Sequence, residues 1–253
     1  MVLSNIKSFT NKSKCGIIYC HFPFRTKGGR PLDFLLQYDY RAGDAACALN
    51  TLHDLAEEGT EAIICRIRCS ADNVLFVHPD TTMTRLCSCD EYVSELQFQE
   101  IRAMMRLCGY YPLTLEEILN GYRGSTRLIL HFRCFRPRAQ IISRIVQDPR
   151  FSLGTDSPEQ LAVFAAGYSG QRTVGFACHL TAAQKMAESG ASEICMYGRD
   201  VDGFGRLDFS DIRIHCPLWY EVLHKPEHGL DEIITKARHI GFDRVTVPLD
   251  YIV

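Results

Sequence analysis

Seven residues with acid–base or anion-binding side chains lie at or near the ends of apolar stretches of this sequence. Arginine forks match phosphate oxygens in charge and geometry, and histidine exchanges protons near neutral pH. Tyrosine can also donate a proton, although its usual pKa is about 10. These residue types therefore indicate a site for a phosphorylated anion. The seven are Tyr40, Arg41, Arg66, Arg68, His78, His131 and Arg133.

The spacing of these residues places several of their side chains on common faces. Side chains alternate along a strand, so Ile64, Arg66 and Arg68 of the stretch EAIICRIR point to one side. The same rule puts His131 and Arg133 of TRLILHFR together. If these stretches lie side by side, they and the nearby Arg41 and His78 bring four arginines and two histidines to one mouth.

The elements that must position these residues are apolar strand-like runs that alternate with amphipathic helical runs. About eight such units in 253 residues favour a closed (β/α)8 TIM barrel, an α/β fold whose functional residues lie at the carboxyl ends of the strands. Strands are predicted over 34–41, 61–68, 73–78, 126–133, 151–155, 173–180, 193–201, 218–223 and 244–249. Helices are predicted over 45–59, 95–107, 114–123, 137–147, 157–168, 181–190 and 229–241, with Ser157 as an N-cap and Pro158 in the first turn.

An open, doubly wound sheet is the alternative to the barrel. That fold normally carries a glycine-rich phosphate loop after its first strand, and YDYRAGDA has one glycine. The turn residues of 27–31 separate an N-terminal arm, 1–31, from the barrel domain, 32–253.

Composition narrows the class of protein. Hydrophobic residues make up 46% of the chain and the net charge is −2, so a large core is expected and nothing requires nucleic acid as a partner. No apolar run approaches the roughly 18 residues of a membrane span. The polar N-terminus makes a poor signal peptide, which favours the cytoplasm.

Twelve cysteines are present, and in the cytoplasm thiols stay reduced. Cys65, Cys69, Cys134, Cys178 and Cys195 lie within apolar strand-like runs, where a thiol packs as a small hydrophobe. Neither Cys87-Ser88-Cys89 nor the Cys15 and Cys20 pair has a second pair at zinc-binding spacing, so a zinc site is not expected.

The order of these stretches resembles the glycerophosphodiester phosphodiesterase family. That family has His-Arg-Gly, Glu-Asn-Thr, Glu-x-Asp, a Lys-Asp-Gly hinge, a second His, Thr-Leu-Asp-Arg and Pro-Thr-Leu-Glu-Glu-Val-Leu in turn. The resemblance covers roughly residues 34 to 253 and is specific from 40 to 119. The matching positions are Tyr40-Arg41-Ala42, Leu49-Asn50-Thr51, Ala71-Asp72-Asn73, His78, Thr81 to Arg85, Pro112 to Leu119 and, later, Trp219.

The departures from the family pattern are concentrated in the site. The resemblance implies a divalent metal on three acidic residues, but their positions hold Ile64, Arg66 and His131. The first catalytic histidine of the family is Tyr40 here, which leaves His78 as the titrating group. Mg²⁺ and Ca²⁺ need oxygen ligands, so no metal or other cofactor is expected, and ordinary hydrolysis should be lost or greatly slowed.

Three functions fit this pattern. The first is a degenerate phosphodiesterase, a pseudoenzyme that binds a small phosphorylated ligand through Arg41, Asn50, Arg66, Arg68, His131, Arg133 and Trp219. The second is a metal-independent enzyme that cleaves, transfers or forms a phosphodiester, with His78 and Tyr40 as proton carriers and arginines as clamps. The third is a structural role in which the apolar stretch 15–24 covers the barrel or a neighbouring chain.

Each site residue also has a packing interpretation. Arg66 and Arg68 are costly to bury alone, so they could instead pair with Asp39 or Glu221. Trp219 could belong to the core. His78 and His131 could be satisfied buried residues, and Asn50 could bond only to backbone.

Overall fold

The computed structural model describes residues 34–37, 44–57, 61–133, 137–168, 170–198, 201–205, 207–213, 216–222 and 230–248. The N-terminal arm, 1–31, and the site residues Tyr40 and Arg41 lie outside them. The strands are β1 (Phe34–Gln37), β2 (Ala62–Cys69), β3 (Leu75–Val77), β4 (Arg127–Phe132), β5 (Phe151–Thr155), β6 (Thr173–Ala177), β7 (Glu193–Met196), β8 (Leu218–Glu221) and β9 (Arg244–Pro248). The helices are α1 (Ala45–Glu57), α2 (Thr84–Cys87), α3 (Phe98–Leu107), α4 (Leu115–Gly121), α5 (Ala139–Val146), α6 (Pro158–Gly167), α7 (Leu180–Glu188), α8 (Val201–Phe204), α9 (Ser210–Arg213) and α10 (Leu230–Ile240).

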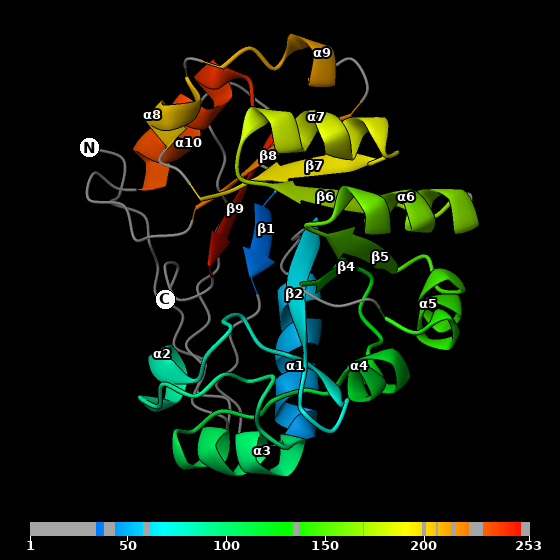
Figure 1. Ribbon diagram of the computed structural model, residues 1–253. Helices are drawn as coiled ribbons and strands as arrows, with labels where there is room; N and C mark the ends of the chain where they lie inside the picture. Colours follow the sequence, from blue (N-terminus) through cyan, green and yellow to red (C-terminus); the bar gives the residue numbers. More distant parts are fainter. Residues whose placement is uncertain are drawn as a thin grey trace.

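Eight of these strands pair in parallel around a closed ring. The order is β1, β9, β8, β7, β6, β5, β4, β2, and β2 pairs again with β1. Each connection between successive ring strands contains at least one helix, and Figure 1 shows α5, α6 and α7 stacked beside β4 to β7. The α/β prediction is confirmed, and the return of the ring to β1 is the pattern of a barrel rather than of an open sheet.

Strand β3 stands outside this ring. It pairs antiparallel with β2, because the turn between them is too tight for a parallel crossover. Ser70 Oγ accepts a hydrogen bond from the Val74 backbone N–H at 3.0 Å, and Asn73 takes a left-handed φ of 63°. The hinge predicted at 71–73 is therefore confirmed. The segment from β3 through α3 forms an insert between β2 and α4.

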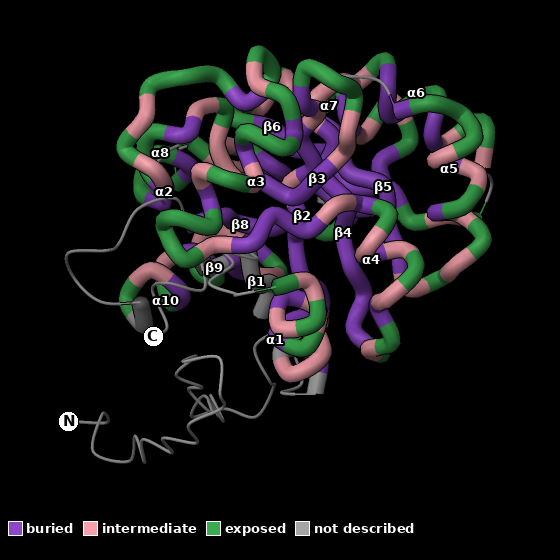
Figure 2. The backbone as a smooth tube through the Cα atoms, turned by 90° about the horizontal axis from the view of Figure 1, so that it is seen from below, coloured by how far each residue is buried: buried purple, intermediate pink, exposed green. Residues whose placement is uncertain are grey.

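The ring strands from β4 to β8 are buried on both faces, and β2 is largely so, as parallel barrel strands should be. Figure 2 shows them as the buried centre of the molecule, surrounded by more exposed helices. The inner cluster consists of Ala62, Ile64, Ile129, Val174, Phe176, Cys195 and Trp219. Larger apolar clusters include side chains from the strands and from helices such as α4, α6 and α7.

Local sequence signals explain where two of the helices begin. Ser157 caps α6 by accepting the Gln160 N–H at 3.1 Å, with Pro158 at the first position, as predicted. Thr114 starts α4 through a capping box with Glu117. The Ser157 cap fixes the chain where it leaves the carboxyl end of β5, and the Thr114 cap fixes it where it leaves the insert.

The cysteines only partly follow their predicted placement. Cys65 and Cys195 are buried free thiols, but Cys178 is exposed just after β6, because the apolar strand ends one residue earlier. Cys47 on α1 is joined in a disulfide. Within the described ranges, none of the helices has the length and apolar character needed to cross a membrane.

Candidate functional site

A cavity of about 460 Å³ opens beside the carboxyl ends of β2 and β4. One wall comes from these strands and the other from the start of the insert, residues 79–85. Four arginines line it, and Asp80 is the one carboxylate residue among the described residues around it. Strand alternation predicted a shared face for Arg66, Arg68 and Arg133, and this is confirmed because all three line the cavity. The arginines are Arg66, Arg68, Arg85 and Arg133.

Arg66 reaches across the barrel to a carboxylate on the far side. Its guanidinium forms an ion pair with Glu221, the last residue of β8, which is completely buried. The Cys195 thiol lies 3.9 Å from the other oxygen of the same carboxylate. The packing interpretation of Arg66 is thus correct for its Glu221 partner. Pairing limits the desolvation cost of the guanidinium, yet Arg66 still borders the cavity.

His131 and Arg133 are held by a single carboxylate. Asp156 lies directly after β5, and its two oxygens are 2.8 Å from His131 Nε2 and 2.8 Å from Arg133 Nε. The His131 ring stacks on Phe176 at 3.6 Å between centroids. Asp156 therefore fixes the orientation of both side chains. It was missed in the sequence, where Ser157 was the residue that gave a recognisable helix signal.

The environment of this trio sets its charges. Burial lowers the pKa of His131 to about 4, although the bond to Asp156 acts in the opposite direction. Burial alone would raise the pKa of Asp156, but its contacts with His131 and Arg133 leave that pKa below the usual value. At neutral pH the trio is a carboxylate that lies between a neutral imidazole and a guanidinium. His131 is thus buried and held by Asp156, and it is not among the described residues that line the cavity.

His78 is also buried and neutral. It is 0% exposed, and its Nδ1 lies 3.2 Å from the backbone N of Asp80 and 3.0 Å from the Asp80 carbonyl. Burial lowers its pKa. Its Nε2 is buried and has no hydrogen-bond partner among the residues that the structure describes. His78 is not among the described residues that line the cavity, so its role as a proton carrier has no direct geometric support.

The insert wall was largely missed as part of the site. Arg85 is paired with Asp80 at 2.8 Å, and Thr84 donates to Asp90 at 3.1 Å. Three hydroxyl-bearing residues also line the cavity, namely Thr81, Thr82 and Thr84. The signal was present in the sequence, since the stretch from Thr81 to Arg85 matches the Thr-Leu-Asp-Arg segment of the family.

The remaining site predictions have mixed outcomes. Arg68 lines the cavity and donates to the Pro79 carbonyl at 3.2 Å. Asn50 is exposed on α1 and Trp219 is completely buried in the inner cluster. Neither is among the described residues of the cavity wall. Asn50 sits inside a helix rather than at its start, and Trp219 packs under the guanidinium groups of Arg127 and Arg244.

The donor set at the family metal position does not fit Mg²⁺ or Ca²⁺. Ile64 is apolar, Arg66 is a cation, and His131 is held against Asp156 and Phe176. Glu221 and Asp156 are engaged by Arg66, His131 and Arg133 rather than grouped around a common point. Over the described ranges, no group of three or more His, Cys, Asp or Glu side chains could hold a metal ion.

Comparison with known proteins identifies the fold. No protein-family model and no curated protein sequence matches this chain. Solved structures do match. A glycerophosphodiester phosphodiesterase from Thermotoga maritima is 14% identical with a TM-score of 0.62, over 88% of this chain and 96% of its own.

Two further structures give the same result. A glycerophosphodiester phosphodiesterase from Parabacteroides distasonis has a TM-score of 0.61 at 14% identity, over 85% of this chain and 92% of its own. A phosphodiesterase from Oleispira antarctica, in complex with the product sn-glycerol-3-phosphate, has a TM-score of 0.59 at 13% identity, over 87% and 93%. The chain therefore has the barrel fold of the glycerophosphodiester phosphodiesterases, and the resemblance inferred from its sequence is confirmed at the level of the fold.

Proposed function

We propose that this barrel binds a small phosphorylated ligand without a divalent metal and with little or no phosphodiester hydrolysis. The observation that carries the proposal is the group of four arginines around one cavity at the carboxyl ends of β2 and β4. Guanidinium groups supply the donors and the charge that phosphate oxygens require. The Oleispira phosphodiesterase, which shares the fold, was solved with sn-glycerol-3-phosphate.

The charge balance at the cavity sets the expected strength of binding. Four guanidiniums are countered by the carboxylates of Asp80, Asp156 and Glu221, with His78 and His131 neutral. Counted over the described residues alone, these groups sum to one positive charge. Because most guanidiniums already have a carboxylate partner, we expect a dissociation constant of about 0.1 to 1 mM rather than nanomolar affinity.

A metal-independent enzyme is the weaker candidate. It would need a proton carrier in contact with the ligand, and His78 is buried with Nδ1 against the backbone of Asp80. The loss of acidic side chains at Ile64, Arg66 and His131 favours binding over hydrolysis. In this proposal the protein is a pseudoenzyme, and an arginine guanidinium takes the place of the family's divalent metal ion.

Calorimetric titration in EDTA tests the proposal. Glycerol 3-phosphate, inorganic phosphate and sulfate are added separately to wild type, Arg133→Gln and Arg144→Gln. Arg144 pairs with Glu116 on the surface, and its side chain is 43% exposed, which makes it a matched control. We expect Arg133→Gln to weaken phosphate binding about fivefold or more and the control to leave it unchanged.

Two results would overturn the proposal. One is the absence of binding at about 10 mM ligand, well above the expected dissociation constant. The other is glycerophosphocholine hydrolysis that EDTA abolishes, because it would require a metal that this donor set does not fit. Hydrolysis that resists EDTA but is lost in His78→Ala would favour the enzyme instead.

A further inference from the structure

Tyr197 lies at the mouth of the barrel, three strands around the ring from β4, which leads into Arg133. It directly follows β7, and its backbone N–H donates to the Ala177 carbonyl at 2.9 Å, so the pairing with β6 continues to this residue. Side chains alternate along a strand, so Tyr197 points to the same side as Cys195 of the inner cluster. The half-buried Tyr197 ring packs against that cluster.

The guanidinium of Arg133 lies over the Tyr197 ring. Its Cζ is 5.7 Å from the ring centroid, which is within the range of a cation–π interaction. Asp156 accepts a hydrogen bond from Nε of the same arginine at 2.8 Å, and Arg133 also lines the cavity. Two supports from two different strands, β5 and β7, thus restrict the orientation of one cavity arginine. A side chain that is already ordered loses less conformational entropy when a ligand binds.

The phenol supports Arg133 without neutralising its charge. Burial raises the pKa of Tyr197 to about 12, and the nearby Asp156 carboxylate acts in the same direction, although Arg133 opposes it. The ring is therefore uncharged at neutral pH, unlike the carboxylate of Asp156. Tyr197 is not among the described residues that line the cavity, so any effect of Tyr197 on a ligand in that cavity is expected to act through Arg133.

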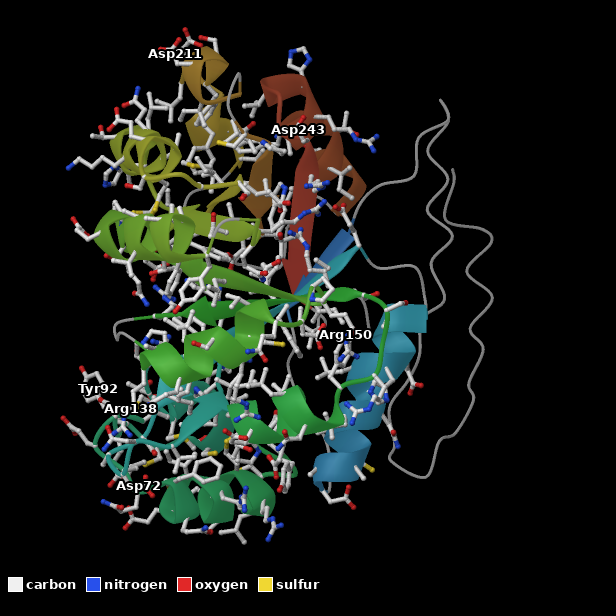
Figure 3. All side chains as sticks on the ribbon, turned by 90° about the vertical axis from the view of Figure 1, so that its right-hand side faces the viewer. Asp72, Tyr92, Arg138, Arg150, Asp211 and Asp243 are labelled. Atoms are coloured by element: carbon white, nitrogen blue, oxygen red, sulfur yellow. The ribbon has the colours of Figure 1, made fainter. Side chains whose placement is uncertain are left out.

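The same arrangement occurs at the amino end of the barrel, around Arg150. This residue, labelled in Figure 3, directly precedes β5. Its Nε donates to Asp148 at 2.9 Å, and its Cζ lies 5.8 Å from the centroid of the Tyr122 ring. The side chains of Arg133 and Arg150 are 25% and 31% exposed, so a reagent in solution can reach both. Because Arg150 is not among the described cavity residues, it is an internal reference for Arg133.

We propose that Tyr197 is a positioning residue for anion binding, because its ring holds the Arg133 guanidinium in the orientation in which it borders the cavity. The contact between Tyr197 and Arg133 does not depend on the proposed function, whereas its effect on phosphate affinity rests on it. Loss of the ring should therefore loosen Arg133 and weaken phosphate binding together.

Chemical modification of the full chain tests the contact without any ligand. Phenylglyoxal reacts selectively with arginine side chains, and peptide mapping over time gives a rate for each arginine. We expect Tyr197→Leu to raise the rate at Arg133 at least about threefold, while Arg150 in the same sample keeps its rate. Tyr197→Phe retains the ring and should react like wild type. A circular dichroism melt of each protein confirms that it is folded.

The binding arm is a titration of the same proteins with inorganic phosphate in EDTA. We expect Tyr197→Leu to weaken phosphate binding about threefold and Tyr197→Phe to keep the affinity of wild type. Tyr168→Leu is the control, because Tyr168 is also half-buried but is the C-cap of α6, away from the cavity residues. This control should leave phosphate affinity unchanged.

Each other outcome decides against a definite part of the proposal. A Tyr197→Leu protein that melts at a lower temperature, but keeps the wild-type rate at Arg133 and the wild-type phosphate affinity, would limit Tyr197 to packing. Equal losses in Tyr197→Leu and Tyr197→Phe would overturn the role of the ring, because the hydroxyl would then be responsible. Faster modification of Arg133 with unchanged phosphate affinity would overturn the effect on binding. If wild type binds no phosphate but Arg133 still reacts faster in Tyr197→Leu, the proposed function fails and the contact stands.

Discussion

The two ends of the barrel use the same residue types in opposite ways. At the amino end, Arg127 begins β4 and donates two hydrogen bonds, at 3.0 and 2.8 Å, to Glu193, which begins β7. Both side chains are at least 91% buried. At the carboxyl end, Arg66 and Arg133 have carboxylate partners as well, but both also border a cavity.

The difference lies in what surrounds each guanidinium. Arg127 and Arg244 lie over the Trp219 ring, at 5.5 and 5.3 Å, so the amino-end cluster is closed by an aromatic layer. At the mouth, Arg133 lies over the Tyr197 ring at 5.7 Å, but the side chain of Arg85 is 46% exposed. Paired arginines thus plug one end of the barrel, and at the other they remain within reach of a ligand.

The largest effect is expected from breaking the amino-end pair. Arg127→Leu leaves the buried Glu193 carboxylate with Arg172 and Arg244 at 3.8 and 3.9 Å as its remaining partners. We expect the free energy of unfolding in urea to fall by about 3 to 5 kcal/mol. The double variant Arg127→Leu/Glu193→Leu should recover much of this loss, because no buried charge is left alone. A single variant as stable as wild type would show that the amino end is not a structural plug.

At the mouth, His131 should make the free energy of unfolding depend on pH. The pKa of His131 is about 4 in the folded protein and 6.5 when unperturbed, because the ring is buried between Phe176, Arg66 and Arg133. Between these values the unfolded chain binds more protons, so stability rises with pH from about 4 to 6.5. We expect His131 to account for a loss of about 2 to 3 kcal/mol as pH falls from 7 to 4.

His131→Asn measures that contribution, since an amide can still donate to Asp156 but does not titrate. Urea unfolding at pH 7 and pH 4.5 should show a smaller difference in the variant than in wild type. His53→Asn is the control, because His53 pairs through Nε2 with the Arg123 backbone away from the mouth. An unchanged pH dependence in His131→Asn would mean that the ring is already charged in the folded state.

The sequence predicted the parts of this comparison that depend on local pattern. Alternation along β2 and β4 grouped Arg66, Arg68 and Arg133, and the capping signals placed Ser157 at the start of α6. The spacing of apolar runs indicated the barrel. These features follow from residues close together in the chain, where strand and helix periods constrain the structure directly.

The partners of the arginines depend on closure of the barrel, which no local pattern specifies. Arg66 and Glu221 are 155 residues apart, and Asp156 is more than 20 residues from the two side chains it holds. For Trp219, strand register decided the outcome. It pairs with Arg244 at the start of β9, which puts it below Glu221 and away from the mouth. A tryptophan on a late strand has the same sequence signature in either position.

A smaller effect is expected from substitution of Glu221, which should lower the stability of the protein but strengthen its binding of phosphate. Glu221→Gln removes the charge that neutralises Arg66 and should cost about 1 to 2 kcal/mol of unfolding free energy. The released guanidinium should bind inorganic phosphate about threefold more tightly. Glu193→Gln is the matched substitution at the other end, and it should destabilise the protein without changing phosphate affinity. Weaker phosphate binding in Glu221→Gln would place Arg66 outside the ligand site.

The smallest change in stability is expected at the rim of the mouth. Arg85 and Asp80 form an ion pair with side chains 46% and 33% exposed, and such pairs contribute little to stability because water screens them. Arg85→Gln should therefore alter the unfolding free energy by less than about 0.5 kcal/mol, as should Arg144→Gln on α5. Only Arg85→Gln should weaken phosphate binding, by about threefold, because its guanidinium lines the cavity and that of Arg144 does not. Equal phosphate affinities in the two variants would mean that the ligand contacts the strand arginines alone, and the insert would then have no part in recognition.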